Sequence, residues 1–114
     1  IKSDTWLFFL EKQVDLNYLP YSARLIQPQN NSHINLLNNQ IEFKWEGYDI
    51  DNDIKSYSLS YGFTIDNLNK TIENILTESV KIELNNNQKY FWQVVTVDLK
   101  GNKSFSTIYE FKTN

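Results

Sequence analysis

The sequence predicts an all-β fold, a seven-stranded antiparallel β-sandwich preceded by an N-terminal arm. Three observations lead to this prediction. Nearly every residue between 90 and 97 is β-branched or aromatic, several other segments alternate strictly between apolar and polar side chains, and turn-forming stretches separate them at regular intervals. Because no long helical pattern lies between the strands, an antiparallel sandwich is favoured over an α/β fold.

The segment 90–97 is the predicted central strand. Since successive side chains of a strand point to opposite faces, one row is expected to face the core and the other to face outward. The inward row is Tyr90, Trp92, Val94 and Thr96, and the outward row is Phe91, Gln93, Val95 and Val97. Polar flanks at 85–89 and 98–102 predict turns on both sides.

The other strands are predicted from period-two alternation. They cover residues 23–27, 41–45, 57–61, 80–84 and 104–113, with 71–76 as a further candidate. The stretch 63–76 is ambiguous, because Ile65, Leu68, Ile72 and Ile75 also have helical spacing. The expected core unites Trp45, Tyr57, Leu59, Tyr61, Ile82, Leu84, Tyr90, Trp92 and Val94.

Residues 1–19 are predicted to form an arm outside the main domain, which spans 20–114. The arm contains the most apolar pentapeptide of the chain: Trp6, Leu7, Phe8, Phe9 and Leu10. Its spacing suits either a short helix or an extended segment, and Pro20 ends whichever forms.

Composition excludes several classes of function. A chain of 114 residues suffices for one core. Its net charge is −3, Arg24 is the only arginine and its basic residues do not cluster, so nucleic-acid binding is excluded. The absence of cysteine rules out disulfides and thiolate chemistry, and no apolar run is long enough to cross a membrane.

No catalytic, cofactor-binding or metal-binding residue is predicted, and the chain is not expected to be an enzyme. Asp49, Asp51 and Asp53 alternate in a loop as Ca²⁺ ligands do, but Ile54 and Ser60 stand where an EF-hand needs glycine and glutamate. We interpret this stretch as a solvated turn. His33, the single histidine, lies in an Asn- and Ser-rich turn without a catalytic partner by spacing.

The sequence resembles fibronectin type III-like domains, a group of immunoglobulin-like sandwiches. The strand with Trp45, the row Tyr57, Leu59 and Tyr61, and the spacing of Leu84 and Tyr90 carry the resemblance. Leu84 and Tyr90 match the tyrosine corner, in which a tyrosine hydroxyl bonds to backbone a few residues upstream. Two features depart from the pattern: no proline lies between Leu84 and Tyr90, and residues 1–19 match nothing in it.

The likeness is closer to a subgroup found in exported lipoproteins of Gram-negative cell envelopes. Its features here are Pro20, Leu25 to Pro28, Trp45, Asp49, Asp51, Asp53, Tyr57, the run from Tyr90 to Asn102, Phe111 and Thr113. The resemblance implies an exported protein of the cell envelope, associated with the outer membrane, and membrane association only through a lipid anchor upstream of Ile1.

Two functions are expected from these features. In the first, the chain is a non-catalytic accessory subunit that docks onto a larger envelope protein or complex through Trp6 to Leu10 and the outward Phe91 and Val95. The outward row could instead be covered by residues 1–16 or by residues 63–76. In the second, the chain is a carbohydrate-binding appendage of a surface glycan-processing system, with Tyr48, Phe63 or Phe105 as a sugar platform.

Overall fold

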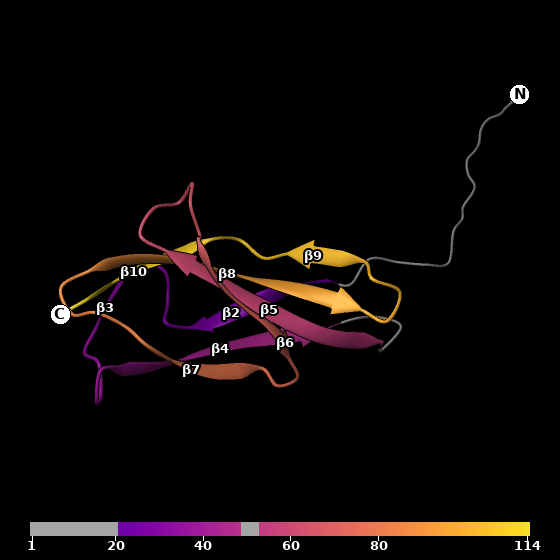
Figure 1. Ribbon diagram of the computed structural model, residues 1–114, viewed down its shortest axis with the longest axis horizontal. Helices are drawn as coiled ribbons and strands as arrows, with labels where there is room; N and C mark the ends of the chain where they lie inside the picture. The colour runs from indigo at the N-terminus through magenta and orange to yellow at the C-terminus, as the bar shows by residue number, and fades with distance from the viewer. Residues whose placement is uncertain (1–20, 49–52) are drawn as a thin grey trace, which may run out of the picture.

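The fold is a sandwich of two β-sheets, seen in a computed structural model that describes residues 21–48 and 53–114 (Figure 1). Nine strands and no helix form within these two ranges. The strands are β2 (Tyr21–Gln27), β3 (Ser32–Ile34), β4 (Gln40–Tyr48), β5 (Ile54–Gly62), β6 (Lys70–Ile75), β7 (Ser79–Glu83), β8 (Lys89–Asp98), β9 (Lys103–Phe105) and β10 (Tyr109–Thr113).

The larger sheet has six strands in the order β3-β10-β8-β5-β6, with β9 also paired to β8, and the smaller has the order β2-β4-β7. All neighbouring strands are antiparallel except β3 and β10, which run parallel. The long β8 lies in the interior of the larger sheet, between β5 on one side and β9 and β10 on the other. The predicted central strand is therefore confirmed.

The prediction of seven strands is wrong by two, for local reasons. The predicted last strand is interrupted after β9, where the hydroxyl of Ser106 accepts a 3.0 Å hydrogen bond from the Val94 N–H in place of a backbone carbonyl. The same hydroxyl donates to the carbonyl of Thr107, and the ladder resumes only at β10. The other added strand, β3, has three residues in an Asn-rich stretch that reads as a turn.

The ambiguous stretch 63–76 contains a strand and no helix. Residues 70–75 form β6 at the edge of the larger sheet, where Ile72 lies opposite Leu59 and Ile75 opposite Tyr57. Asn74 has a positive φ of 60°, and the register with β5 shifts beside it. This irregularity explains why the apolar residues of the stretch do not alternate with a strict period of two.

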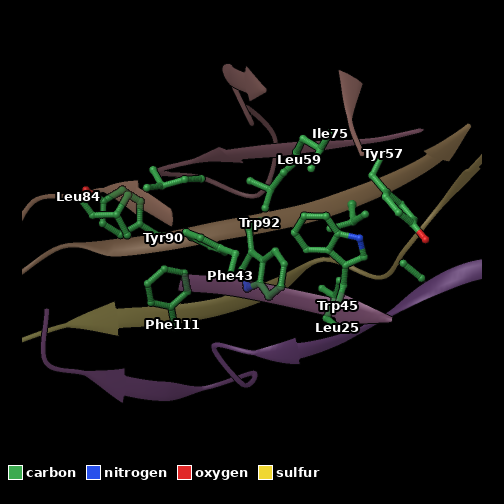
Figure 2. Packing of buried hydrophobic residues seen from close by; sticks show 13 residues of the cluster. Leu25, Phe43, Trp45, Tyr57, Leu59, Ile75, Leu84, Tyr90, Trp92 and Phe111 are labelled. Carbon is green, nitrogen blue, oxygen red and sulfur yellow. The ribbon is translucent and has the colours of Figure 1, made fainter. Parts of the chain in front are cut away.

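The core lies between the two sheets and is mostly the predicted one. Eight of its nine expected members are buried, and Tyr61 is half-buried. Figure 2 shows Leu84 and Tyr90 at one end of this cluster and Trp45 and Tyr57 at the other, with Trp92 between them. Phe43 packs edge-to-face on Trp92 with ring centroids 4.9 Å apart, a favoured aromatic geometry.

The outward row of β8, for which the sequence left an open patch and a covered face as alternatives, is partly buried. Val95 is only 7% exposed, and Phe91 and Val97 are half-buried. Val95 has cross-strand neighbours on both sides, Ser58 on β5 and Phe105 on β9. Phe105 is 59% exposed and is thus more open to solvent than its neighbour Val95. The segment 70–75 pairs with β5 at the edge of this sheet and therefore does not lie over the face.

Asparagine and aspartate shape several turns of the described chain. Asn31, Asn38, Asn39 and Asn87 all have positive φ, a conformation that asparagine tolerates better than most residues. In the turn after β8, Oδ1 of Asp98 accepts hydrogen bonds from the N–H groups of Lys100 and Asn102.

Several expectations lie outside the described residues. They are the arm 1–19 with its boundary at Pro20, and the loop that contains Asp49 and Asp51. Within the described part of the chain, no helix is long and apolar enough to cross a bilayer.

Candidate functional site

A pocket of about 280 Å³ lies at one end of the sandwich and is the candidate functional site. It forms where the connection between β5 and β6 approaches the connection between β7 and β8. Figure 1 shows the β5–β6 connection as a hairpin that projects from the upper left of the sandwich. The lining residues are Tyr61, Gly62, Phe63, Asn69, Lys70, Glu83, Leu84, Asn85 and Tyr90.

The floor of the pocket is the tyrosine corner. Leu84 and Tyr90 are 6% and 3% exposed, and the Asn85 N–H donates a 2.8 Å hydrogen bond to the Tyr90 hydroxyl. The contact that the resemblance to fibronectin type III-like domains implied is thus present. From the end of β10, the Thr113 hydroxyl donates to the Asn85 carbonyl over 2.6 Å, and the Gln88 N–H donates to that hydroxyl. The β7–β8 connection is therefore held at several points.

Aromatic rings form one wall. Tyr61 and Phe63 both face Tyr90, with ring centroids 6.3 and 5.5 Å from its own. Phe63 is 51% exposed although it belongs to this cluster. Burial, and secondarily the neighbouring Tyr90, raises the pKa of Tyr61, so its phenol is neutral at physiological pH. A neutral phenol can both donate and accept a hydrogen bond.

Gly62 positions this wall. A Cβ at residue 62 would collide with the backbone carbonyl oxygen of Asn67 and lie 3.0 Å from the Cα of Leu68. Only glycine lets the returning chain pass so close to the end of β5. The hairpin is closed further by a 3.2 Å hydrogen bond from the Asn67 N–H to the Thr64 carbonyl. Phe63 is thereby held beside Tyr90 rather than on a free loop.

The rim is polar and carries one charge of each sign. Asn69 and Lys70 stand on the β6 side, and Glu83 and Asn85 stand on the β7 side. Among the described residues, none forms a hydrogen bond or ion pair with these four side chains. Amides, a carboxylate and an ammonium group are thus available to a ligand from both sides of the pocket.

A second, shallower hollow of about 350 Å³ continues the pocket. It shares Glu83, Leu84 and Asn85 with the first and adds Asn39 and Asn86. Asn39 lies in the turn before β4. The carbonyl of Asn39 accepts a 2.9 Å hydrogen bond from the Leu84 N–H. The pocket and the hollow together form one depression, aromatic in the pocket and amide-lined in the hollow.

The residues predicted for partner binding do not line this depression. Phe91 and Val95 lie on the outer face of the larger sheet, half-buried and buried respectively. Trp6, Leu7, Phe8, Phe9 and Leu10 lie outside the described residues. Their role in docking stays a prediction.

The three aromatics expected as a sugar platform do not converge. Phe63 lies at the pocket, near Glu83, which pairs with Gln40 at the start of β4. Tyr48 ends β4, roughly 26 Å away at about 3.3 Å per residue. There it stacks on Tyr21 with ring centroids 5.2 Å apart. Phe105 pairs with Val95, toward the far end of β8 from Tyr90.

Sequence reasoning missed the polar rim, Asn69, Lys70, Glu83 and Asn85. The tyrosine corner was a usable signal for one side, since it places Asn85 directly beside Tyr90. No local pattern indicates that the stretch 62–70 returns to the same place, because that depends on the pairing of β6 with β5.

Of the residues weighed for metal binding and catalysis, only Asp53 and His33 lie within the described part of the chain. Asp49 and Asp51 lie outside the described residues, and the carbonyl of Asp53 accepts a hydrogen bond from the Leu99 N–H. His33 is exposed on β3, opposite Lys112. Within residues 21–48 and 53–114, no three His, Asp or Glu side chains are grouped as a metal site requires.

Comparisons with known proteins show the fold. No protein-family model matches the sequence, and no curated protein matches it. An α-L-rhamnosidase from Dictyoglumus thermophilum is similar over 85% of this chain, with 18% identity and a TM-score of 0.65. An endo-β-1,4-mannanase from Thermotoga petrophila is similar over 89%, with 13% identity and a TM-score of 0.59.

The chain spans only 12% of the rhamnosidase chain and 21% of the mannanase chain. A structure described as a myokine is similar over 83% of this chain and 95% of its own, with 17% identity and a TM-score of 0.58. At these identities the likeness concerns the β-sandwich and not a shared activity.

Proposed function

We propose that this chain is a non-catalytic accessory module with a fibronectin type III-like fold that serves a glycan-processing protein or assembly. The observation that supports it most is the place of this fold in the two glycoside hydrolases, where the matched part makes up 12% and 21% of the chain. In those enzymes, a sandwich of this size is a small part of a much larger chain. Such a part suits a role in positioning or recruitment.

Docking onto a larger protein is the first form of this role. The apolar run Trp6 to Leu10 would occupy a partner's groove or pair with a partner's sheet edge, as extended apolar segments do. The resemblance to envelope lipoproteins supports export, outer-membrane association and a lipid anchor upstream of Ile1. Phe91, on the outer sheet face, would add to the contact with the partner. Val95, on the same face, is buried and would pack beneath that contact.

Truncation tests the docking form. The full chain and a chain lacking residues 1–16 are compared for their free energy of unfolding and for co-fractionation with the envelope complex in the native host. Docking predicts equal stability and lost co-fractionation of the truncated chain. Early melting or aggregation of the truncated chain would show that the arm belongs to the domain's own core.

Direct carbohydrate binding is the second form, and the pocket between the two connections favours it. An exposed phenylalanine, a tyrosine hydroxyl and two amides that pair with no described residue line one concave site there. Binding of soluble polysaccharides, measured by retarded migration in native gels, tests this form independently of any protein partner. Aryl-glycoside assays on the same preparation test the non-catalytic role, for which no hydrolysis is expected.

A further inference from the structure

We propose that the pocket lined by Tyr61, Phe63 and Tyr90 binds one ring of a neutral oligosaccharide, and that the adjoining amide-lined hollow binds the next sugar. This inference rests on the carbohydrate-binding form of the proposed function. It adds the location of the site, the number of sugar rings that it holds and the charge of the ligand.

The aromatic wall suits the apolar face of a pyranose. A pyranose ring carries its C–H groups on its faces and its hydroxyls around its edge, so a flat aromatic ring covers it without leaving polar groups unpaired. Phe63 is 51% exposed, yet it is fixed against Tyr90 and follows the sterically restricted Gly62. Covering Phe63 removes apolar surface from water at little entropic cost, because the ring is already positioned.

The polar rim suits the hydroxyls. Each sugar hydroxyl both donates and accepts, and the available groups offer both functions: the Tyr61 phenol, the amides of Asn69 and Asn85, the Glu83 carboxylate and the Lys70 ammonium. Since none of the four rim side chains is paired with a described residue, ligand binding would break no such bond within the described domain.

The charges favour a neutral ligand. Lys70 and Glu83 stand on opposite sides of the pocket and contribute one positive and one negative charge. An anionic ligand would gain an ion pair with Lys70 but would approach Glu83, and a cationic ligand would meet the reverse arrangement. A neutral polyhydroxyl ligand can bond to both groups through charge-assisted hydrogen bonds.

The dimensions favour more than one sugar. The pocket of about 280 Å³ is slightly smaller than the range of about 300–1,000 Å³ that is usual for small-molecule sites. The hollow adds about 350 Å³ and shares Glu83, Leu84 and Asn85 with the pocket, so a ligand can continue from one into the other. There Asn39 and Asn86 present further amides and no aromatic ring. A second sugar would therefore bind by hydrogen bonds alone.

Calorimetric titration of the full chain tests the inference. The probes are neutral gluco- and manno-oligosaccharides of increasing length, with an oligogalacturonate as the anionic comparison. We expect neutral oligosaccharides to bind more tightly than their monosaccharides, and the oligogalacturonate to bind at least tenfold more weakly. The variant Phe63→Ala should lose tenfold or more in affinity, and Glu83→Gln should lose severalfold.

Phe105→Ala is the matched control. Phe105 is an aromatic of similar exposure, 59% against 51%, far from the pocket on β9. The Phe105→Ala variant should bind neutral oligosaccharides with the affinity of the wild type. The backbone amide signals of Lys70 and Asn85 in the unaltered chain should shift on titration, a readout that does not depend on the folding of any variant.

Two results would overturn the inference, and they are distinguishable. If the chain binds neutral oligosaccharides but Phe63→Ala does so equally well and the Lys70 and Asn85 signals do not move, the site lies elsewhere and carbohydrate binding stands. If the unaltered chain binds none of the probes at millimolar concentration, both the pocket and the carbohydrate-binding form fail. The docking form would then remain, to be decided by the truncation.

Discussion

The backbone N–H of Asn85 donates a 2.8 Å hydrogen bond to the hydroxyl of Tyr90. This contact ties the end of β7, in the smaller sheet, to the start of β8, in the larger one. It also sets the floor of the candidate pocket, because both residues line it. The same bond therefore serves the fold and the site.

Removal of this bond should lower stability without unfolding the domain. Tyr90→Phe keeps the buried ring and deletes only the hydroxyl, so the expected loss is about 1 kcal/mol, the usual net contribution of one hydrogen bond. Tyr61→Phe is the control, because no hydrogen bond of its hydroxyl is seen within the described residues. Urea denaturation measures both. Equal midpoints for Tyr90→Phe and wild type would mean that the corner bond adds nothing to stability.

Gly47 should not tolerate a side chain. A Cβ there would collide with the Tyr57 hydroxyl and lie 2.8 Å from two of its ring carbons, and Tyr57 is itself packed on Trp45. Gly47→Ala is expected to cost about 1–3 kcal/mol, as overpacking does. Thermal unfolding would measure the loss.

A double-mutant cycle checks the cause. In a Tyr57→Phe background the nearest colliding atom is absent, so the same glycine substitution should cost less. An identical cost in both backgrounds would place the strain elsewhere, for instance at the 2.8 Å hydrogen bond from the Gly47 N–H to Glu78.

Asp98 should make stability depend on pH in the acidic range. Asp98 is 1% exposed, and burial by itself raises the pKa of its carboxyl group. Hydrogen bonds from Asn102 and Lys100 outweigh burial and hold the pKa of Asp98 below its ordinary value. Because the folded-state pKa is lowered, the stabilisation is present above the unfolded-state value of about 3.9 and is lost as the pH falls through the folded-state pKa.

Asp98→Asn tests this dependence. The variant should be less stable than the wild type at neutral pH, and the difference should shrink as the pH falls below about 4. Denaturation midpoints across the acidic range provide the measurement. A difference that stays constant down to the lowest pH would contradict a role for the carboxylate charge.

Trp92→Ala should be the most destabilising of these changes. Trp92 is 0% exposed and packs against Phe43 and Tyr109. It lies on β8, which pairs with β5 on one side and with β9 and β10 on the other. Truncation of such a side chain costs about 3–5 kcal/mol through lost transfer energy and a residual cavity. Chemical denaturation measures the loss, and a midpoint within error of the wild type would contradict the observed register of β8.

Local information in the sequence predicted the faces of the strands. The alternation of Tyr90, Trp92 and Val94 placed these side chains in the core, and a period of two needs no knowledge of the rest of the chain. Asn38 and Asn39 have positive φ, a conformation that asparagine tolerates better than most residues. The tyrosine corner was implied by the resemblance to fibronectin type III-like domains, which the spacing of Leu84 and Tyr90 carries.

Only the tertiary structure decided the number of strands, the cover of the outer face and the site. The hydroxyl of Ser106 accepts a hydrogen bond from Val94 on β8 and so interrupts the predicted last strand. Phe105, on the adjacent strand β9, lies directly opposite Val95. Phe63 and Glu83 meet across a pocket although twenty residues separate them in sequence, as the pairings of β5 with β6 and β4 with β7 dictate. A residue's own pattern specifies which face it occupies, whereas the identity of its neighbour depends on strand pairing between distant segments.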